Sequence, residues 1–169
     1  MKHPIFSFMM VILLGATLLS TGCKKKDSDK GCSGFPTVSG DVQVNGEDQI
    51  LIAAQSIINA FGGQDNYLIQ LTAIEDDCNT THTISFNIDI PTGSTLNGVY
   101  PFKDFFDADS GEASGDYTVQ VLEPLSQSAK SITSGSLSVE NKGGGNYVFD
   151  MNANLAGGGN VKMKVSAKL

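Results

Sequence analysis

Arginine and tryptophan are absent from this 169-residue sequence, and histidine occurs only twice. Proteins that bind nucleic acids rely on clusters of lysine and arginine for phosphate contacts, and on arginine for many base contacts. This chain has 18 acidic and 11 basic residues, which gives a formal net charge of −7. We therefore expect no nucleic-acid partner, and we interpret the acidity as a source of solubility.

Residue types that carry catalysis or bind metals are also scarce. His82 is the only histidine beyond residue 3, and it lies on the apolar side of an alternating run, as a packed or capping residue would. The chain has no G-x-S-x-G motif, no H-E-x-x-H motif and no cysteine pair at zinc-ligand spacing. The sequence predicts neither catalytic residues nor a cofactor, and we expect a protein that is not an enzyme.

No hydrophobic run is long enough to span a membrane comfortably as a helix, which takes about 20 apolar residues. The longest one covers residues 5–20, follows a lysine at position 2, and ends in small residues directly before Cys23. A positive start, a short apolar segment and small residues at a cut site are typical of a secretory signal peptide. We assign residues 1–22 to that signal.

Cys23 directly follows the small residues Ser20, Thr21 and Gly22. This junction resembles the bacterial lipobox, although Ser20 stands where leucine is usual. The resemblance implies that the Cys23 sulfur receives a diacylglyceryl group and that the chain is cut just before it. A stable anchor needs two or more acyl chains, each contributing about 0.8 kcal/mol per buried CH₂. The alternative is an ordinary signal peptide beside an incidental cysteine.

Residues 23–35 are polar and charged, with "KKKDSDKG" directly after Cys23. Such a composition predicts a flexible linker between the lipid and the domain, because it offers little apolar surface to bury. Lysines followed by aspartates also resemble the charged signals that send some Bacteroidetes lipoproteins to the outer face of the outer membrane. A solvated linker explains the same residues equally well.

Two cysteines remain if Cys23 carries lipid. Cys32 and Cys78 are an even pair in a chain that we expect to be exported, and such pairs indicate a disulfide. Closing this loop would stabilise the fold by about 4 kcal/mol on the chain-entropy model. The alternative is two free or partly buried thiols.

Residues 36–169 are expected to form a single β domain. Apolar and polar residues alternate over residues 82–90, 146–155 and 160–169, and this period of two indicates strands with one buried face. The last two runs flank "AGGGN" and predict a hairpin, in which we pair Leu155 with Val161 and Met151 with Val165. Residues 48–61 fit a strand or a helical stripe, and their isoleucines and flanking turns favour a strand.

The number of short alternating runs predicts an all-β fold. We expect an antiparallel β-sandwich of about eight or nine strands, and a small closed up-and-down β-barrel is the alternative. Neither the pattern nor the turns separate the two architectures.

The stretch "VYPFKDFFDADSGE" holds the candidate contact residues. Its aromatic side chains could contact a ligand or partner if exposed, or belong to the core; they are Tyr100, Phe102, Phe105 and Phe106. Asp107, Asp109 and Glu112 offer oxygen ligands that would suit Ca²⁺. Their spacing departs from the EF-hand pattern, so we predict an acidic surface loop and no metal.

The whole plan resembles the short uncharacterised cell-envelope lipoproteins of the Bacteroidetes, on the junction at Cys23, the charged linker and the glycine-linked strands of "SITSGSLSVENKGGGNYVFDMNANL". The resemblance implies a lipid-anchored envelope protein at the outer membrane, with a β domain and no assigned activity. We expect a non-enzymatic binding or accessory module that reaches the membrane through its N-terminal lipid. Its partner would be a small ligand or an envelope protein, and the alternative is a structural component of an envelope complex.

Overall fold

The computed structural model describes residues 32, 38–61 and 64–169, with the backbone alone over residues 56–61 and at residue 64. The expected signal peptide, Cys23 and most of the linker lie outside the described residues. Within those residues, no helix has the length and apolar character to cross a membrane. The strands are β1 (Gly40–Val44), β2 (Glu47–Phe61), β3 (Gln64–Ile74), β4 (Thr80–Pro91), β5 (Gly98–Pro101), β6 (Ala113–Val121), β7 (Ser126–Gly143), β8 (Asn146–Leu155) and β9 (Asn160–Lys168).

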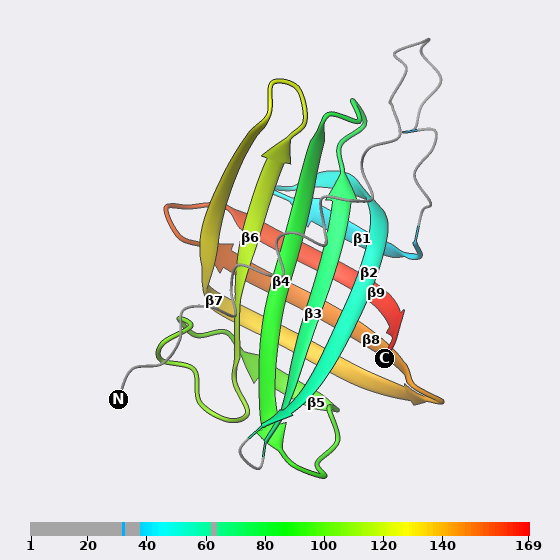
Figure 1. Cartoon of the computed structure of the whole chain (residues 1–169), viewed down its shortest axis with the longest axis vertical. Coiled ribbons are helices and arrows are strands. Elements are labelled where there is room, and N and C mark those ends of the chain that lie inside the picture. The colour runs from blue at the N-terminus through cyan, green and yellow to red at the C-terminus, as the bar shows by residue number, and fades with distance from the viewer. Residues whose placement is uncertain (1–31, 33–37, 62–63) are drawn as a thin grey trace.

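These strands form a closed antiparallel barrel (Figure 1). Its eight strands follow the order β7-β6-β4-β3-β2-β1-β9-β8, and the pairing of β7 with β8 closes the ring. The short strand β5 pairs with β7 as an additional strand. The all-β prediction is confirmed. Closure decides between the two architectures in favour of the barrel, so our preference for a sandwich was wrong.

Strands β2 and β7 make the corners that close the barrel. Residues 126–131 of β7 pair with β6, whereas the rest of the strand, from Ile132, pairs with β8. In the same way β2 pairs with β1 over residues 47–49 and with β3 from Ile50 onward. Each strand has a register shift near its change of partner. Bulges and bends are the usual means by which one strand joins two sheets that cross at a steep angle, as they do in Figure 1.

Gly135 lies at the β7 corner and has a φ of 127°. Residues with a Cβ atom rarely adopt this backbone conformation. A Cβ atom there would lie 2.2 Å from the backbone oxygen of Asn152 on β8. The corner therefore depends on glycine both for its backbone angle and for the close approach of the two strands.

Apolar side chains from all parts of the barrel fill its interior. Phe86 on β4 is fully buried and packs edge-on against Phe102 and Phe149, with ring centroids 6.4 and 6.0 Å apart. The alternation predicted for residues 82–90 is confirmed, because Ile84, Phe86, Ile88 and Ile90 are all buried. Each such side chain contributes about 1.5–3 kcal/mol when it leaves water.

The hairpin of β8 and β9 has the predicted faces but a different register. Met151 lies opposite Met163, and Ala153 lies opposite Val161. The expected pairing of Leu155 with Val161 is therefore wrong by two residues. An even shift keeps every side chain on its face, so the alternation that determines burial does not determine the partner.

Residues 48–61 lie in β2 and confirm the preference for a strand. Their pairing with β3 runs from Ile50 opposite Ile74 to Phe61 opposite Gln64. The residues that would have formed the apolar stripe of a helix are instead paired with β3, a long antiparallel strand. Tertiary pairing of this kind overrides a weak helix propensity.

Candidate functional site at the loop between β5 and β6

The four candidate aromatic residues divide into two pairs. Tyr100 and Phe102 are only 5% and 3% exposed and belong to the core. The Phe102 N–H donates to the backbone oxygen of Gly135, which ties the end of β5 to the β7 corner. Of the two readings that the sequence left open, contact with a partner or a place in the core, the core holds for Tyr100 and Phe102. Tyr100 lies in β5 and Phe102 directly follows that strand, and both side chains face the interior of the barrel.

Phe105 and Phe106 are exposed at the tip of the loop between β5 and β6. Their exposed fractions are 52% and 91%, the latter the highest among the large hydrophobic residues that the structure leaves exposed. The two rings stand edge to face with centroids 5.6 Å apart. Two hydrogen bonds to Asp104 shape the tip: its side chain accepts from the Phe106 N–H and its carbonyl accepts from the Asp107 N–H.

Backbone hydrogen bonds fix this loop to the barrel. The carbonyl oxygen of Asp89 at the end of β4 accepts from the Gly111 N–H at 2.8 Å. At the two ends of the loop, the Lys103 N–H donates to the carbonyl of Ala113 at 2.9 Å. The aromatic pair is thus held on a loop with defined geometry, so less conformational entropy is lost when a partner binds it.

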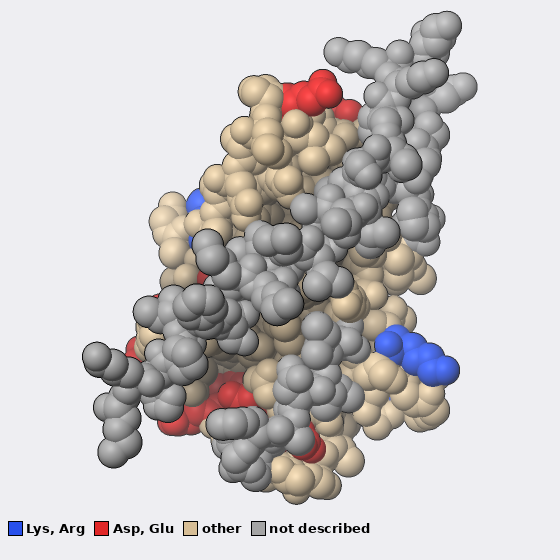
Figure 2. All heavy atoms as spheres, viewed as in Figure 1, with Lys and Arg blue, Asp and Glu red and all other residues tan. Residues whose placement is uncertain are grey.

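Two carboxylates of the loop, those of Asp104 and Glu112, have partners within the loop. A Glu112 side-chain oxygen accepts from the Asp109 N–H at 3.0 Å, and the other lies 3.9 Å from the Lys103 Nζ. Among the described residues, no group of three or more potential ligands is arranged to hold a metal ion. Figure 2 shows acidic side chains at both ends of the visible face, one of which carries this loop.

His82 belongs to a hydrogen-bonded network at the other end of the barrel, in which His82 and Tyr117 are buried and Glu75 is partly exposed. It is 4% exposed, and its Nδ1 lies 2.6 Å from the Tyr117 hydroxyl while its Nε2 lies 2.9 Å from a carboxylate oxygen of Glu75. The alternation over residues 82–90 predicts His82 on the inward side of its strand but indicates neither of its partners. Tyr117 is on the inward side of β6, a signal that alternation could have supplied, whereas Glu75 comes from a turn without periodicity.

Burial, and secondarily the charge of Glu75, raises the pKa of Tyr117 to about 12. Tyr117 therefore keeps its proton at neutral pH and can donate it to Nδ1 of His82. The Tyr117 hydroxyl and the Glu75 carboxylate thus lie within hydrogen-bond distance of the two ring nitrogens of His82, so each group of the network has a partner. This arrangement satisfies the hydrogen-bonding groups of the buried His82 and Tyr117 side chains.

The cysteines expected to form a disulfide do so. Cys32 and Cys78 are bonded, with their Cα atoms 5.3 Å apart. Cys78 lies in the turn between β3 and β4, and Cys32 packs against Ile52 and Ile74. The Cys32 Sγ also lies 3.1 Å from the backbone oxygen of Glu75, so the disulfide and the His82 network share one end of the barrel.

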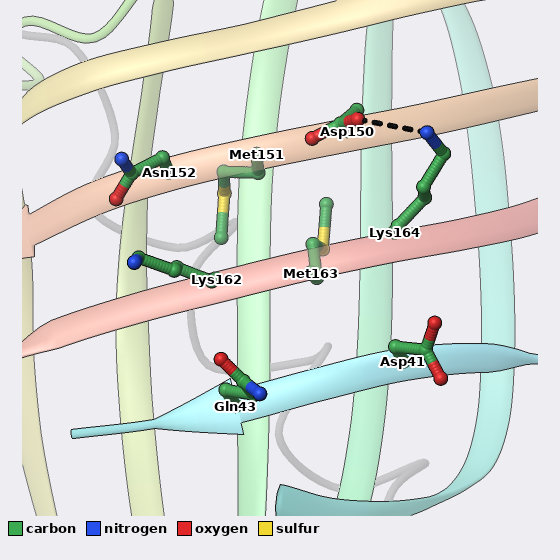
Figure 3. Close-up of a pocket in the computed structure, with 8 residues that line it drawn as sticks. All are labelled: Asp41, Gln43, Asp150, Met151, Asn152, Lys162, Met163 and Lys164. Atoms are coloured by element: carbon green, nitrogen blue, oxygen red, sulfur yellow. Dashed lines mark ion pairs between the residues drawn. The ribbon is translucent and has the colours of Figure 1, made fainter. Parts of the chain in front are cut away.

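The outer face of β1, β9 and β8 carries a shallow depression of about 390 Å³ (Figure 3). Its outward side chains are polar, and Asp150 pairs with the Lys164 Nζ at 3.2 Å. Lys162 lies opposite Gln43 on one side and Asn152 on the other. An open, polar surface without aromatic residues gives a ligand little area to bury, so this face is a weaker candidate than the aromatic loop.

Neither a family model, a curated protein nor a solved structure matches this chain. The choice of a candidate site therefore depends on the exposure, hydrogen bonds and charges of the residues described above. Of the features described, the loop between β5 and β6 combines exposed apolar surface with a fixed conformation, and we take it as the candidate functional site.

Proposed function

We propose that this protein is a lipid-anchored cell-envelope module that binds a partner with its outer surface and catalyses no reaction. Cys23 would carry the lipid, and the exposed pair of Phe105 and Phe106 would make the central contact. The observation that carries the proposal is the 91% exposure of Phe106 on a loop tied to the barrel. Exposed aromatic pairs of this kind are typical of contact sites.

The filled interior supports binding on the outside. Phe86, Phe149 and their neighbours occupy the space in which a carrier barrel would hold a ligand. A partner that covers both rings of the loop would gain several kcal/mol of binding free energy, at about 1.5–3 kcal/mol for each side chain. A surface contact of this size suits an accessory protein that recognises one partner.

The test compares two variants that each remove a largely exposed apolar side chain. Phe106→Ala removes the candidate contact, and Leu125→Ala is the matched control because Leu125 is 75% exposed in a different turn. Full-length protein would be extracted gently from its own envelope and weighed by native mass spectrometry. We expect a bound mass with the unmodified protein and with Leu125→Ala, and its loss with Phe106→Ala at unchanged stability.

Retention of the bound mass by Phe106→Ala would contradict the proposal. A bound small mass would identify a ligand, whereas a stoichiometric protein would favour the alternative role in an envelope complex. The same spectrum tests the anchor, since the expected species begins at Cys23 and carries acyl mass. A chain without acyl mass would refute the anchor.

A further inference from the structure

The expected tether enters the barrel at the end that carries the turn between β3 and β4. The disulfide of Cys32 and Cys78 fixes the chain to this turn. The next described contact, from the Val38 N–H to the Leu51 carbonyl, lies at the same end, because Leu51 pairs with Ala73 near the end of β3. Two attachments thus hold the N-terminal side of the domain at one end of the barrel.

The turn between β6 and β7 belongs to this end as well. The Asn79 side chain, next to Cys78, donates to the Glu123 carbonyl at 3.0 Å and accepts from the Glu123 N–H at 2.9 Å. Leu125 follows in that turn and is 75% exposed. Leu125 therefore marks the disulfide end of the barrel.

The aromatic loop lies at the opposite end. Strand β4 starts directly after the disulfide turn and runs to Pro91, and the loop is bonded to Asp89 near the end of that strand. Asp89 lies nine residues beyond Thr80 along β4, which corresponds to about 30 Å at the usual rise of a strand. Figure 1 shows this separation, with the turn between β3 and β4 at the top and the loop between β5 and β6 at the lower left.

The tether is on average shorter than this distance. Nine peptide bonds separate Cys23 from Cys32, which allows at most about 30 Å when fully extended. A flexible chain of this length has an average end-to-end distance of about 15–18 Å. A domain held so closely by one end keeps that end near the bilayer.

We infer that the disulfide end of the barrel faces the membrane that carries the lipid, and that the Phe105–Phe106 loop is presented on the far side to a protein partner with an apolar, positively charged surface. This inference rests on the proposed anchor at Cys23. It adds the orientation of the domain and the chemistry of its partner.

Charge determines the kind of partner. Four carboxylates accompany the two rings in the loop, against the single cation of Lys103; they are Asp104, Asp107, Asp109 and Glu112. A surface with anionic lipids would repel this loop, whereas lysine and arginine around an apolar pocket would complement it. The aromatic pair is therefore suited to a basic protein surface rather than to a bilayer.

Energy transfer on vesicles tests the orientation. Lipidated full-length protein would carry one dye at Leu125→Cys or at Asp107→Cys, on vesicles of phosphatidylethanolamine and phosphatidylglycerol that contain a rhodamine-labelled lipid. We expect strong transfer from position 125 and much weaker transfer from position 107. A flexible Gly-Ser insertion after Lys30 is the control, and it should reduce the difference because it lengthens the tether.

Equal transfer from both positions on vesicle-bound protein would overturn the orientation. Failure of the protein to bind vesicles would instead refute the proposed anchor, so the two outcomes are distinguishable. Because the insertion leaves the disulfide and the barrel unchanged, a difference that persists with the longer tether would also count against the inference.

Photo-crosslinking tests the partner. Benzoylphenylalanine at Phe106 should crosslink to a protein in native envelopes, at a site rich in lysine or arginine, and the same probe at Leu125 should not. High salt or Asp107→Lys should lower the yield several-fold, since both weaken attraction between opposite charges. Crosslinks to lipid, or a yield unaffected by salt and by Asp107→Lys, would overturn the assignment.

Discussion

The β7 corner offers the most informative test of the fold, because it combines two separate costs of replacing glycine. Gly135→Ala would place a Cβ 2.2 Å from the Asn152 oxygen and would also force a non-glycine residue to a φ of 127°. Unfavourable backbone angles of this kind cost about 1–3 kcal/mol. Overpacking adds about 1–3 kcal/mol. The two costs together should lower the free energy of unfolding of Gly135→Ala by about 2–6 kcal/mol.

Two other glycines separate these costs. Gly157, in the turn between β8 and β9, has a φ of 71° and no atom within 4 Å of an added Cβ, so Gly157→Ala carries the backbone cost alone. Gly115 on β6 is not in the positive-φ region, but an added Cβ would lie 2.4 Å from the Ser85 oxygen on β4. Gly115→Ala therefore carries the steric cost alone. Each single-cost variant should lose less stability than Gly135→Ala.

Urea unfolding measures all three variants, followed by far-UV circular dichroism and by tyrosine fluorescence, since the chain has no tryptophan. If the free energy of unfolding falls with urea concentration at the same slope in all variants, the substitutions alter stability and not the unfolded state. The reasoning would be refuted if Gly135→Ala were no more destabilising than Gly157→Ala. That result would mean that β7 and β8 do not approach closely at the corner that closes the barrel.

Three further results are expected. Replacing both Cys32 and Cys78 with serine should lower the free energy of unfolding by about 4 kcal/mol in urea, and a loss below about 1 kcal/mol would contradict the constraint that we assign to the disulfide. Phe102→Ala should cost about 3–5 kcal/mol in the same assay, as is usual for a core phenylalanine; a change within about 0.5 kcal/mol would place Phe102 on the surface. The raised pKa of Tyr117 means that the folded state keeps a proton that the unfolded state loses, so stability should fall between pH 10 and pH 12, and Tyr117→Phe should flatten this fall. An unchanged slope in Tyr117→Phe would contradict the role of Tyr117, because Tyr67 and Tyr100, whose pKa values are also raised, would then account for the whole effect.

The alternation of apolar and polar residues correctly predicted most of the buried positions in the strands. The apolar positions of residues 82–90, 146–155 and 160–169 face the interior almost without exception, because a side chain in a strand has only two directions. The same rule placed His82 inside. It did not identify Glu75, which approaches His82 from a turn where no period applies.

Neither alternation nor composition distinguishes the buried from the exposed aromatic residues between positions 100 and 106. Tyr100 and Phe102 lie in or beside β5 and point into the core, whereas Phe105 and Phe106 follow in a loop and point into solvent. All four residues have the same chemical character, so composition cannot separate them. The separation depends on where the strand ends and on the hydrogen bonds that turn the loop away from the barrel.

The sequence by itself determined that this chain forms an antiparallel all-β domain and which faces of its strands are buried, because these properties follow from local periodicity. The pairing of Cys32 with Cys78 was an expectation that set Cys23 aside for lipid, and the structure supplied the bond. Only the tertiary structure decided that β7 closes the ring against β8 and that the β8–β9 hairpin pairs two residues away from the expected register. It alone placed the disulfide and the aromatic loop at opposite ends of the barrel. These features depend on long-range pairing, to which a pattern with a period of two is insensitive, since every even shift of a strand preserves its buried face.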